Sequence, residues 1–275
     1  MADLGRPIVP KEHGAWAVLY GSLLVGLGVA GRFTIPVLLL LVGVTACAFA
    51  NGPLALLVRP AAGPGQIARR RQALLWILVY GAVAVATLVP LVTVFRMTFL
   101  LPFGMGAMFF VVVRAYQLRE REDRTLGGAL TGMAGITLAA PAAHAVAAGA
   151  AQPVGAMLWG LCFLFFGSGI FYVRMRVQGM LAARQGASAS SNPALLPCVL
   201  YHAILLAVMP SLALAQVIPW PVLVAFAPAI WRAGAGLRRH EARLDLRRLG
   251  WSEVALTSAF ILLLIGALHL APLLG

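Results

Sequence analysis

Nine apolar runs, separated by short polar links, divide the 275-residue chain. Most of these runs hold about 17–22 residues without a charge, which is enough for a helix to cross a hydrocarbon core of about 30 Å. We predict transmembrane helices over residues 14–30, 33–50, 74–95, 97–113, 127–148, 154–173, 194–215, 217–230 and 254–274. The predicted fold class is therefore an all-α, polytopic membrane helix bundle, and we expect one integral membrane domain over residues 1–275.

The composition agrees with this pattern and excludes a soluble domain. Hydrophobic residues make up 61% of the chain, charged residues 11%, and the mean hydropathy is +0.93. These values are typical of multi-pass membrane proteins. The three cysteines, Cys47, Cys162 and Cys198, lie inside apolar runs without metal-ligand spacing, so we expect neither a disulfide scaffold nor a bound metal.

The net charge of +13 could indicate nucleic-acid binding, but its distribution does not. Of the 21 lysines and arginines, 19 lie before the first apolar run or in the links after the second, fourth, sixth and eighth. By the positive-inside rule, the N-terminus and these links are cytoplasmic and the C-terminus is outside. The charge thus predicts membrane topology, and we expect no nucleic-acid partner.

The acidic residues follow the same asymmetry. All eight lie on the predicted cytoplasmic side, and the predicted spans hold no acid or base other than histidine. Channels and proton pumps normally carry ionisable groups within their spans. This pattern argues against a continuous proton or cation path.

The segment PKEHGAWAVL places three ionisable residues directly before the first span. It contains Lys11, the only lysine, together with Glu12 and His13, and Trp16 follows one helical turn later. These residues would serve equally as an interface anchor or as part of a site. In the site interpretation, Lys11 and Trp16 bind a substrate, and Glu12 or His13 acts as the acid or base.

Two further clusters lie at the cytoplasmic ends of later spans. Asn51 and Arg59 are two helical turns apart at the end of the second span, and Tyr172 and Arg176 share a helix face near the end of the sixth. Arginines at these positions either set the topology or bind an anionic group bidentately. We count Arg114, at the end of the fourth span, among the candidate substrate-binding residues.

The remaining histidines, His144, His202 and His269, lie within or near apolar runs. Two of them could ligate a haem, although single histidines with hydrogen-bonded side chains are the simpler interpretation. The sequence leaves haem binding open.

The segments PKEHGAWAVL, FYVRMRV and RRLGWSEVALTSAF together resemble the YwiC-like family of bacterial membrane proteins. The layout also resembles, more distantly, the UbiA superfamily of intramembrane prenyltransferases. That second resemblance implies nine helices, a lipid-accessible cavity and a polar mouth facing the cytoplasm. It also implies a diphosphate bound through magnesium by an aspartate-rich motif.

This chain departs from the UbiA motif where the magnesium ligands would stand. Asn51 matches the asparagine of the motif, but the two acid positions fall on Ala55 and Arg59. Magnesium bridging of a diphosphate needs carboxylates, so we do not expect Mg²⁺ as a cofactor, and the cofactor stays unknown. Arg59, Arg176 and Lys11 would instead hold an anionic head group directly.

Three functions remain open from the sequence. The favoured one is binding of an isoprenoid or other lipid with an anionic head at the cytoplasmic side, with transferase activity undecided. The second is transport or export of a small or lipidic anion. The third is a non-catalytic accessory role in respiratory-enzyme or haem assembly.

Overall fold

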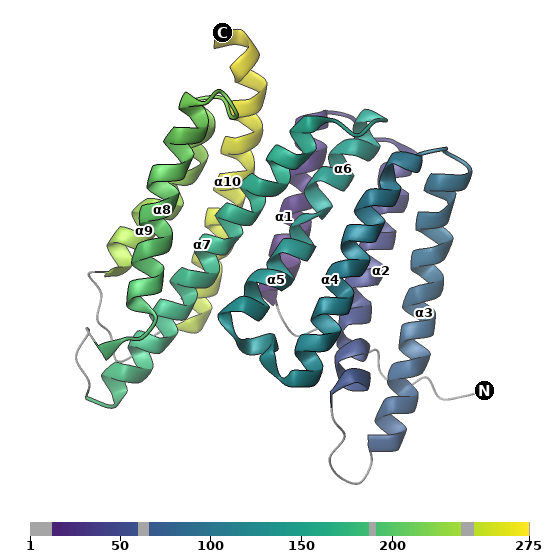
Figure 1. Ribbon diagram of the computed structural model, residues 1–275, viewed down its shortest axis with the longest axis horizontal. Coiled ribbons are helices and arrows are strands. Elements are labelled where there is room, and N and C mark those ends of the chain that lie inside the picture. Colours follow the sequence, from purple (N-terminus) through teal and green to yellow (C-terminus); the bar gives the residue numbers. More distant parts are fainter. Residues whose placement is uncertain (1–12, 60–65, 187–190, 238–244, 275) are drawn as a thin grey trace. The chain divides into compact units, whose positions relative to one another are not determined.

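The computed structural model describes residues 13–59, 66–186, 191–237 and 245–274, and all regular elements in these ranges are helices (Figure 1). The chain divides into two compact units, Met1–Gly155 and Ala156–Gly275, and each is described by itself. The interpretation of residues 1–275 as one membrane domain stays a prediction.

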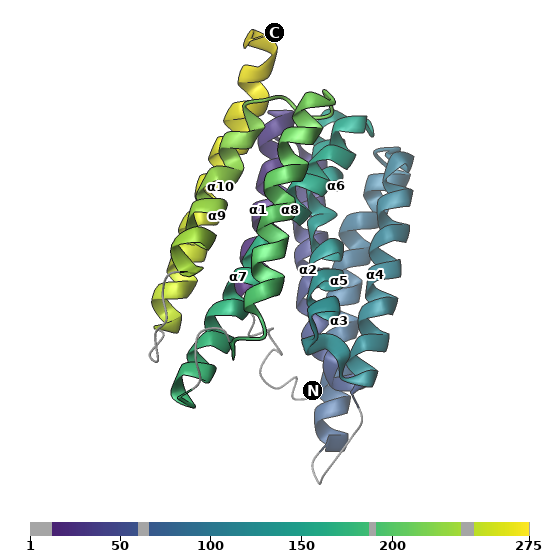
Figure 2. The same ribbon diagram turned by 60° about the vertical axis from the view of Figure 1, so that its left-hand side comes forward.

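The first unit contains six α-helices and two short 3₁₀ helices. Their bounds are α1 His13–Ala30, α2 Ile35–Val58, α3 Gln66–Thr93, η1 Thr98–Leu100, α4 Leu101–Glu120, η2 Glu122–Arg124, α5 Leu126–Thr137 and α6 Ala139–Ala148. Helix α1 packs against α6, and α2 packs against α3. The end of α2, the start of α3 and the turn between α4 and α5 lie at the same end of this unit (Figures 1 and 2).

The second unit contains most of α7 Pro153–Arg184, followed by α8 Leu195–Leu214, α9 Val222–Leu237 and α10 Leu246–Leu274. Its core is aromatic. The rings of Phe165 and Phe260 stack 3.8 Å apart, and Phe226 meets Phe260 edge-on at 5.5 Å. These three rings join α7, α9 and α10, because one of them comes from each helix.

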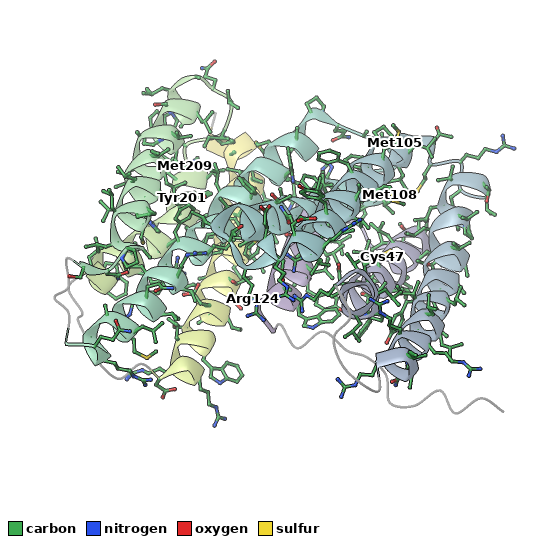
Figure 3. All side chains as sticks on the ribbon, turned by 60° about the horizontal axis from the view of Figure 1, so that its bottom comes forward. Cys47, Met105, Met108, Arg124, Tyr201 and Met209 are labelled. Carbon is green, nitrogen blue, oxygen red and sulfur yellow. The ribbon has the colours of Figure 1, made fainter. Side chains whose placement is uncertain are left out.

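The structure confirms the polytopic membrane bundle. Seven helical segments are long and apolar enough to cross a membrane, and residues Gly14–Ala30 and Val222–Leu237 form shorter apolar helices. Large apolar side chains are exposed along the long helices, including Leu78 on α3 and Met105 and Met108 on α4 (Figure 3). Such outward-facing side chains would be unfavourable in water and suit lipid contact.

The predicted span 127–148 is interrupted in the structure. Helix α5 ends at Thr137, Leu138 forms a turn, and α6 begins at Ala139. Pro141 explains the break, because it has no amide hydrogen to donate to the carbonyl of Thr137, four residues earlier, and its ring crowds that carbonyl. Helix α6 consists mostly of alanine and is almost entirely buried.

Small residues allow the close approach of α1 and α6. A methyl group added at Gly26 of α1 would lie 2.1 Å from the backbone oxygen of Ala140 and 2.9 Å from the backbone nitrogen of His144. Backbone atoms cannot move aside as a flexible side chain can. Close packing through small residues is a usual way for membrane helices to associate.

Gly26→Ala is therefore expected to destabilise the first unit, by roughly 1–3 kcal/mol, since α1 must move away from α6. Gly81→Ala is the matched control, because nothing lies within 4 Å of a methyl group at that position of α3. Thermal unfolding in detergent, followed by fluorescence-detected size exclusion, measures both. Equal melting temperatures for the two variants would contradict the close α1–α6 contact.

Candidate functional site

The predicted site residues fall in different parts of the chain. Trp16, Asn51, Arg59 and Arg114 belong to the first unit, and Tyr172 and Arg176 belong to the second. Lys11 and Glu12 lie outside the described residues, and His13 is the first residue of α1, with no described side chain. Their convergence on one polar mouth, and the acid–base role of Glu12 or His13, stay predictions.

Arg59 and Arg114 both bind Asp123, which lies in the turn between α4 and α5. Arg59 follows the last residue of α2, and its Nη2 donates to the Asp123 carboxylate at 2.6 Å. Nη1 of Arg114 donates to the backbone oxygen of Asp123 at 3.4 Å. Two residues that the sequence singled out separately therefore contact the same acidic residue.

A third arginine joins this group from α3. Nη2 of Arg70 donates to the backbone oxygen of Arg59 at 3.1 Å, and its buried Nε has no hydrogen-bond partner among the described residues. We call Arg59, Arg70, Arg114 and Asp123 the arginine cluster. With three guanidinium groups and one carboxylate, it carries excess positive charge and can accept an anion.

Local sequence fixes the position of Asp123. Thr125 caps α5, because its hydroxyl accepts a hydrogen bond from the Gly128 amide at 3.0 Å. Gly128 must lack a side chain, since a methyl group there would lie 2.4 Å from the backbone oxygen of Glu122. Arg121 ends α4 in the left-handed region, with φ of 60°. The turn is thereby held tightly enough to present Asp123 to α2.

An aromatic strip lies on the three helices α1, α2 and α3. Trp16 stacks near Tyr20 at 6.0 Å and meets Phe49 at 4.8 Å, Phe49 stacks on Tyr80 at 5.5 Å, and Tyr80 meets Trp76 at 5.4 Å. The indole nitrogen of Trp76 is buried without a partner among the described residues. Aromatic residues of this kind favour the interface between hydrocarbon and head groups.

Asn51 belongs to the level of this strip and not to the level of the arginine cluster. It is exposed, two residues after Phe49, and eight residues before Arg59. At 1.5 Å per residue, Asn51 and Arg59 are about 12 Å apart along α2. The amide and the guanidinium are therefore separated along the helix, and one elongated ligand could reach both.

The second unit contains a buried cation that the sequence analysis placed in a link. Arg232 is only 6% exposed, within α9, and Nη1 donates to Oε2 of Glu253 on α10. Nη2 donates to the hydroxyl of Ser168 on α7 at 3.2 Å. The guanidinium carbon lies 4.4 Å from the centre of the Tyr172 ring, which gives a cation–π contact.

Arg232 and Glu253 lie in helices that extend beyond the predicted spans, which end at residue 230 and begin at residue 254. Arg232 lies inside α9, and Glu253 lies inside the apolar segment Arg247–Ala271. The signal in the sequence is the run AGAGL after Arg232, which continues the apolar helix to Leu237. A predicted span that stops at residue 230 ends about two turns too early.

Tyr172 and Arg176, the predicted pair on α7, are both buried, at 7% and 9% exposure. The Tyr172 ring supports Arg232, and a methyl group at Gly236 would lie 2.5 Å from this ring. Tyr172 therefore has a packing role besides the predicted substrate contact. The substrate-binding roles of Tyr172 and Arg176 stay predictions.

Two polar residues of α8, Cys198 and His202, lie near the buried pair of Arg232 and Glu253. Nδ1 of His202 donates to the backbone oxygen of Cys198 at 2.8 Å, and its buried Nε2 has no partner among the described residues. Cys198 packs in one apolar cluster with Tyr172 and Met175. Tyr201, labelled in Figure 3, instead donates to the backbone oxygen of Leu164 at 2.8 Å.

The other two histidines differ in their surroundings. His144 is buried on α6 with an unpartnered Nδ1 among the described residues, whereas His269 is exposed near the end of α10. Across the described ranges, no three side chains of histidine, cysteine, aspartate or glutamate come together as a possible metal site. Haem ligation by two of the three histidines stays an alternative prediction from the sequence.

Comparison with known proteins concerns the first unit. Residues 9–144 match the family model described as YwiC-like protein, which is just under half of the 275 residues. This confirms the resemblance to the YwiC-like family. The match runs from before α1 into α6, so it includes the arginine cluster and the aromatic strip. No curated protein and no solved structure matches the chain.

The cation–π contact in the second unit can be tested by paired substitutions. Tyr172→Phe keeps the ring under Arg232 and should change the free energy of unfolding by less than about 1 kcal/mol. Tyr172→Leu removes the ring and leaves space beside Gly236, so we expect a loss of roughly 2–4 kcal/mol. Thermal unfolding of the purified variants compares them; equal losses would exclude a role for the ring face.

Proposed function

We propose that this YwiC-like membrane protein binds a lipid with an anionic head, such as an isoprenoid phosphate, at the arginine cluster. The observation that supports this is an excess of guanidinium groups around one carboxylate. Arg59 donates to the Asp123 carboxylate, Arg114 donates to the Asp123 backbone oxygen, and Arg70 donates to the Arg59 backbone oxygen. A phosphate oxygen can take over the hydrogen bonds that Asp123 now accepts. Such charge-assisted bonds are roughly twice as strong as neutral ones.

The exposure of the two ion-pair partners supports exchange by a ligand. The Arg59 side chain is 44% exposed and that of Asp123 is 8% exposed. An anion can reach the exposed arginine, whereas the largely buried carboxylate would lose its partner, and the new contacts to the ligand must offset that cost. Arg59 is therefore available from the aqueous side, while Asp123 is held by its turn.

The aromatic strip supports a lipidic ligand over a small soluble anion. Trp16, Phe49 and Tyr80 form a continuous apolar and aromatic surface along helices that also carry or adjoin the cluster. An isoprenoid chain can lie against such rings while its head stays with the arginines. Asn51, about 12 Å from Arg59 along the helix, would then contact the ligand beyond its head.

The proposal includes the orientation. The basic links at the end of α2 and after α4 are cytoplasmic by the positive-inside rule, so the head group binds from the cytoplasm of a bacterial cell and the C-terminus is outside. A transferase step would use Glu12 or His13 as acid or base. The direct arginine contacts would replace a magnesium-bridged diphosphate, because Asp123 is a single carboxylate already paired with Arg59.

We expect the double substitution Arg59→Gln and Arg114→Gln to remove most co-purifying anionic lipid, roughly tenfold or more, because each lost charge-assisted hydrogen bond weakens binding. Mass spectrometry of lipid extracted from purified protein measures this. Arg32→Gln is the control, because Arg32 follows α1 and does not belong to the arginine cluster. Glu12→Gln should keep the lipid. Unchanged lipid in the double variant would overturn the proposal.

Asp123→Asn is expected to act in the opposite direction. The amide keeps the size of the side chain but removes the negative charge that competes with the lipid head for Arg59. Lipid occupancy in the folded variant should rise severalfold. Glu122→Gln, in the same turn, is the matched control. Lower occupancy in Asp123→Asn would mean that Asp123 helps to hold the ligand.

A further inference from the structure

The buried pair of Arg232 and Glu253 leaves hydrogen-bonding capacity unused on both sides. Nε of Arg232 and Oε1 of Glu253 are buried and have no partner among the described residues. Arginine and carboxylate can form two parallel hydrogen bonds, but here one nitrogen serves Glu253 and another serves Ser168. The Arg232 side chain is 7% exposed and that of Glu253 is 25% exposed, and ionisable groups within apolar helices of membrane proteins usually mark a functional site.

Arg232 is held in place independently of Glu253. The Ser168 hydroxyl donates to the backbone oxygen of Phe165 at 2.6 Å, so its oxygen is left to accept from Arg232. The Tyr172 ring covers one face of the guanidinium at 4.4 Å. Both contacts come from α7, whereas Glu253 comes from α10. The cation would therefore keep its position if Glu253 moved or lost its charge.

The groups that face this pair come from every helix packed around it. Helix α7 contributes Ser168, Tyr172 and Gly169, whose added methyl group would lie 3.3 Å from Oε2 of Glu253. Helix α8 contributes Cys198 and His202, both close enough for the charge of Arg232 to act on them. Glu253 is the only acid that contacts Arg232 among the described residues, so the pair as a whole is neutral.

We propose that Arg232 is the centre of a second binding site, specific for a monocarboxylate, whose occupation is coupled to protonation of Glu253. The ligand carboxylate binds the guanidinium in place of Glu253, and the Glu253 carboxylate takes one proton from water. One negative charge enters and one is neutralised, so the net charge of the buried site is unchanged. A dianionic phosphate would leave an unbalanced negative charge there, which the low-dielectric surroundings disfavour.

This site is separate in its residues from the arginine cluster of the first unit. The carboxylate proposal goes beyond the lipid proposal and does not depend on it. Substitutions at Arg59 and Arg114 should leave it intact, and substitutions at Glu253 should leave the co-purified lipid unchanged. Failure of one proposal can therefore be distinguished from failure of the other.

The coupling fixes the direction of the pH dependence. Binding requires protonated Glu253, so raising the pH lowers the affinity wherever Glu253 is ionised in the ligand-free protein. The expected decrease is about tenfold per pH unit in that range, with about one proton taken up per ligand bound. A site without this coupling would bind the same ligand with no proton uptake.

Benzoate is a suitable probe, because it is a soluble monocarboxylate that stays ionised above pH 6. Calorimetric titration of the full-length protein in lipid nanodiscs, repeated in two buffers of different ionisation enthalpy, gives the number of protons taken up per benzoate. We expect about one in the unmodified protein. The proposal is overturned if benzoate shows no saturable binding to the unmodified protein. It is also overturned if benzoate binds without proton uptake.

Glu253→Gln assigns the proton to its residue. This variant leaves Arg232 without a competing carboxylate, so benzoate should bind with no proton uptake and with an affinity independent of pH. Glu122→Gln, which removes an exposed acid of the first unit, should behave as the unmodified protein does. Proton uptake that persists in folded Glu253→Gln overturns the assignment.

Discussion

A guanidinium group removed from water must keep an opposite charge beside it, and this requirement organises the polar parts of both units. In the second unit, Arg232 lies among apolar helices and is held by Glu253, Ser168 and the Tyr172 ring. The helices α7, α9 and α10 must therefore assemble around that one cation. In the first unit, Arg59 is half in solvent, so its pairing with Asp123 serves position more than stability.

The positions of the helices could be predicted from the sequence because hydrocarbon leaves the backbone few alternatives. An apolar run of sufficient length must satisfy its own hydrogen bonds, and the helix is the local way to do so. Residues Leu126–Ala148 form one candidate span as predicted, but the apolar run alone does not predict the break within it. Pro141 cannot donate to the carbonyl of Thr137, so the apolar run over residues 127–148 forms two helices, α5 and α6.

The candidate sites could be predicted only in part, because pairing depends on contacts between distant residues. Arg59 and Arg114 could be named from their places at the ends of apolar runs. Their common partner Asp123 lies 64 residues beyond Arg59, and no spacing rule connects the two. Arg232 was assigned to a link because an arginine ordinarily ends a span. Glu253, 21 residues later, makes its burial possible.

The two ion pairs differ in what a ligand must overcome to replace the acid. At Arg59 the cation is 44% exposed and its acid Asp123 is 8% exposed, so under the lipid proposal an anion would reach the arginine directly while Arg70 and Arg114 lie beside it. At Arg232 the exposure is reversed: the arginine side chain is 7% exposed and that of Glu253 is 25% exposed, although Oε1 of Glu253 is buried. In the proposal for this pair, a displaced Glu253 would lose its cation while Oε1 stays buried, and protonation would compensate for that loss. Under the two proposals, the exposure of the cation would thus separate anion exchange at Arg59 from proton-linked exchange at Arg232.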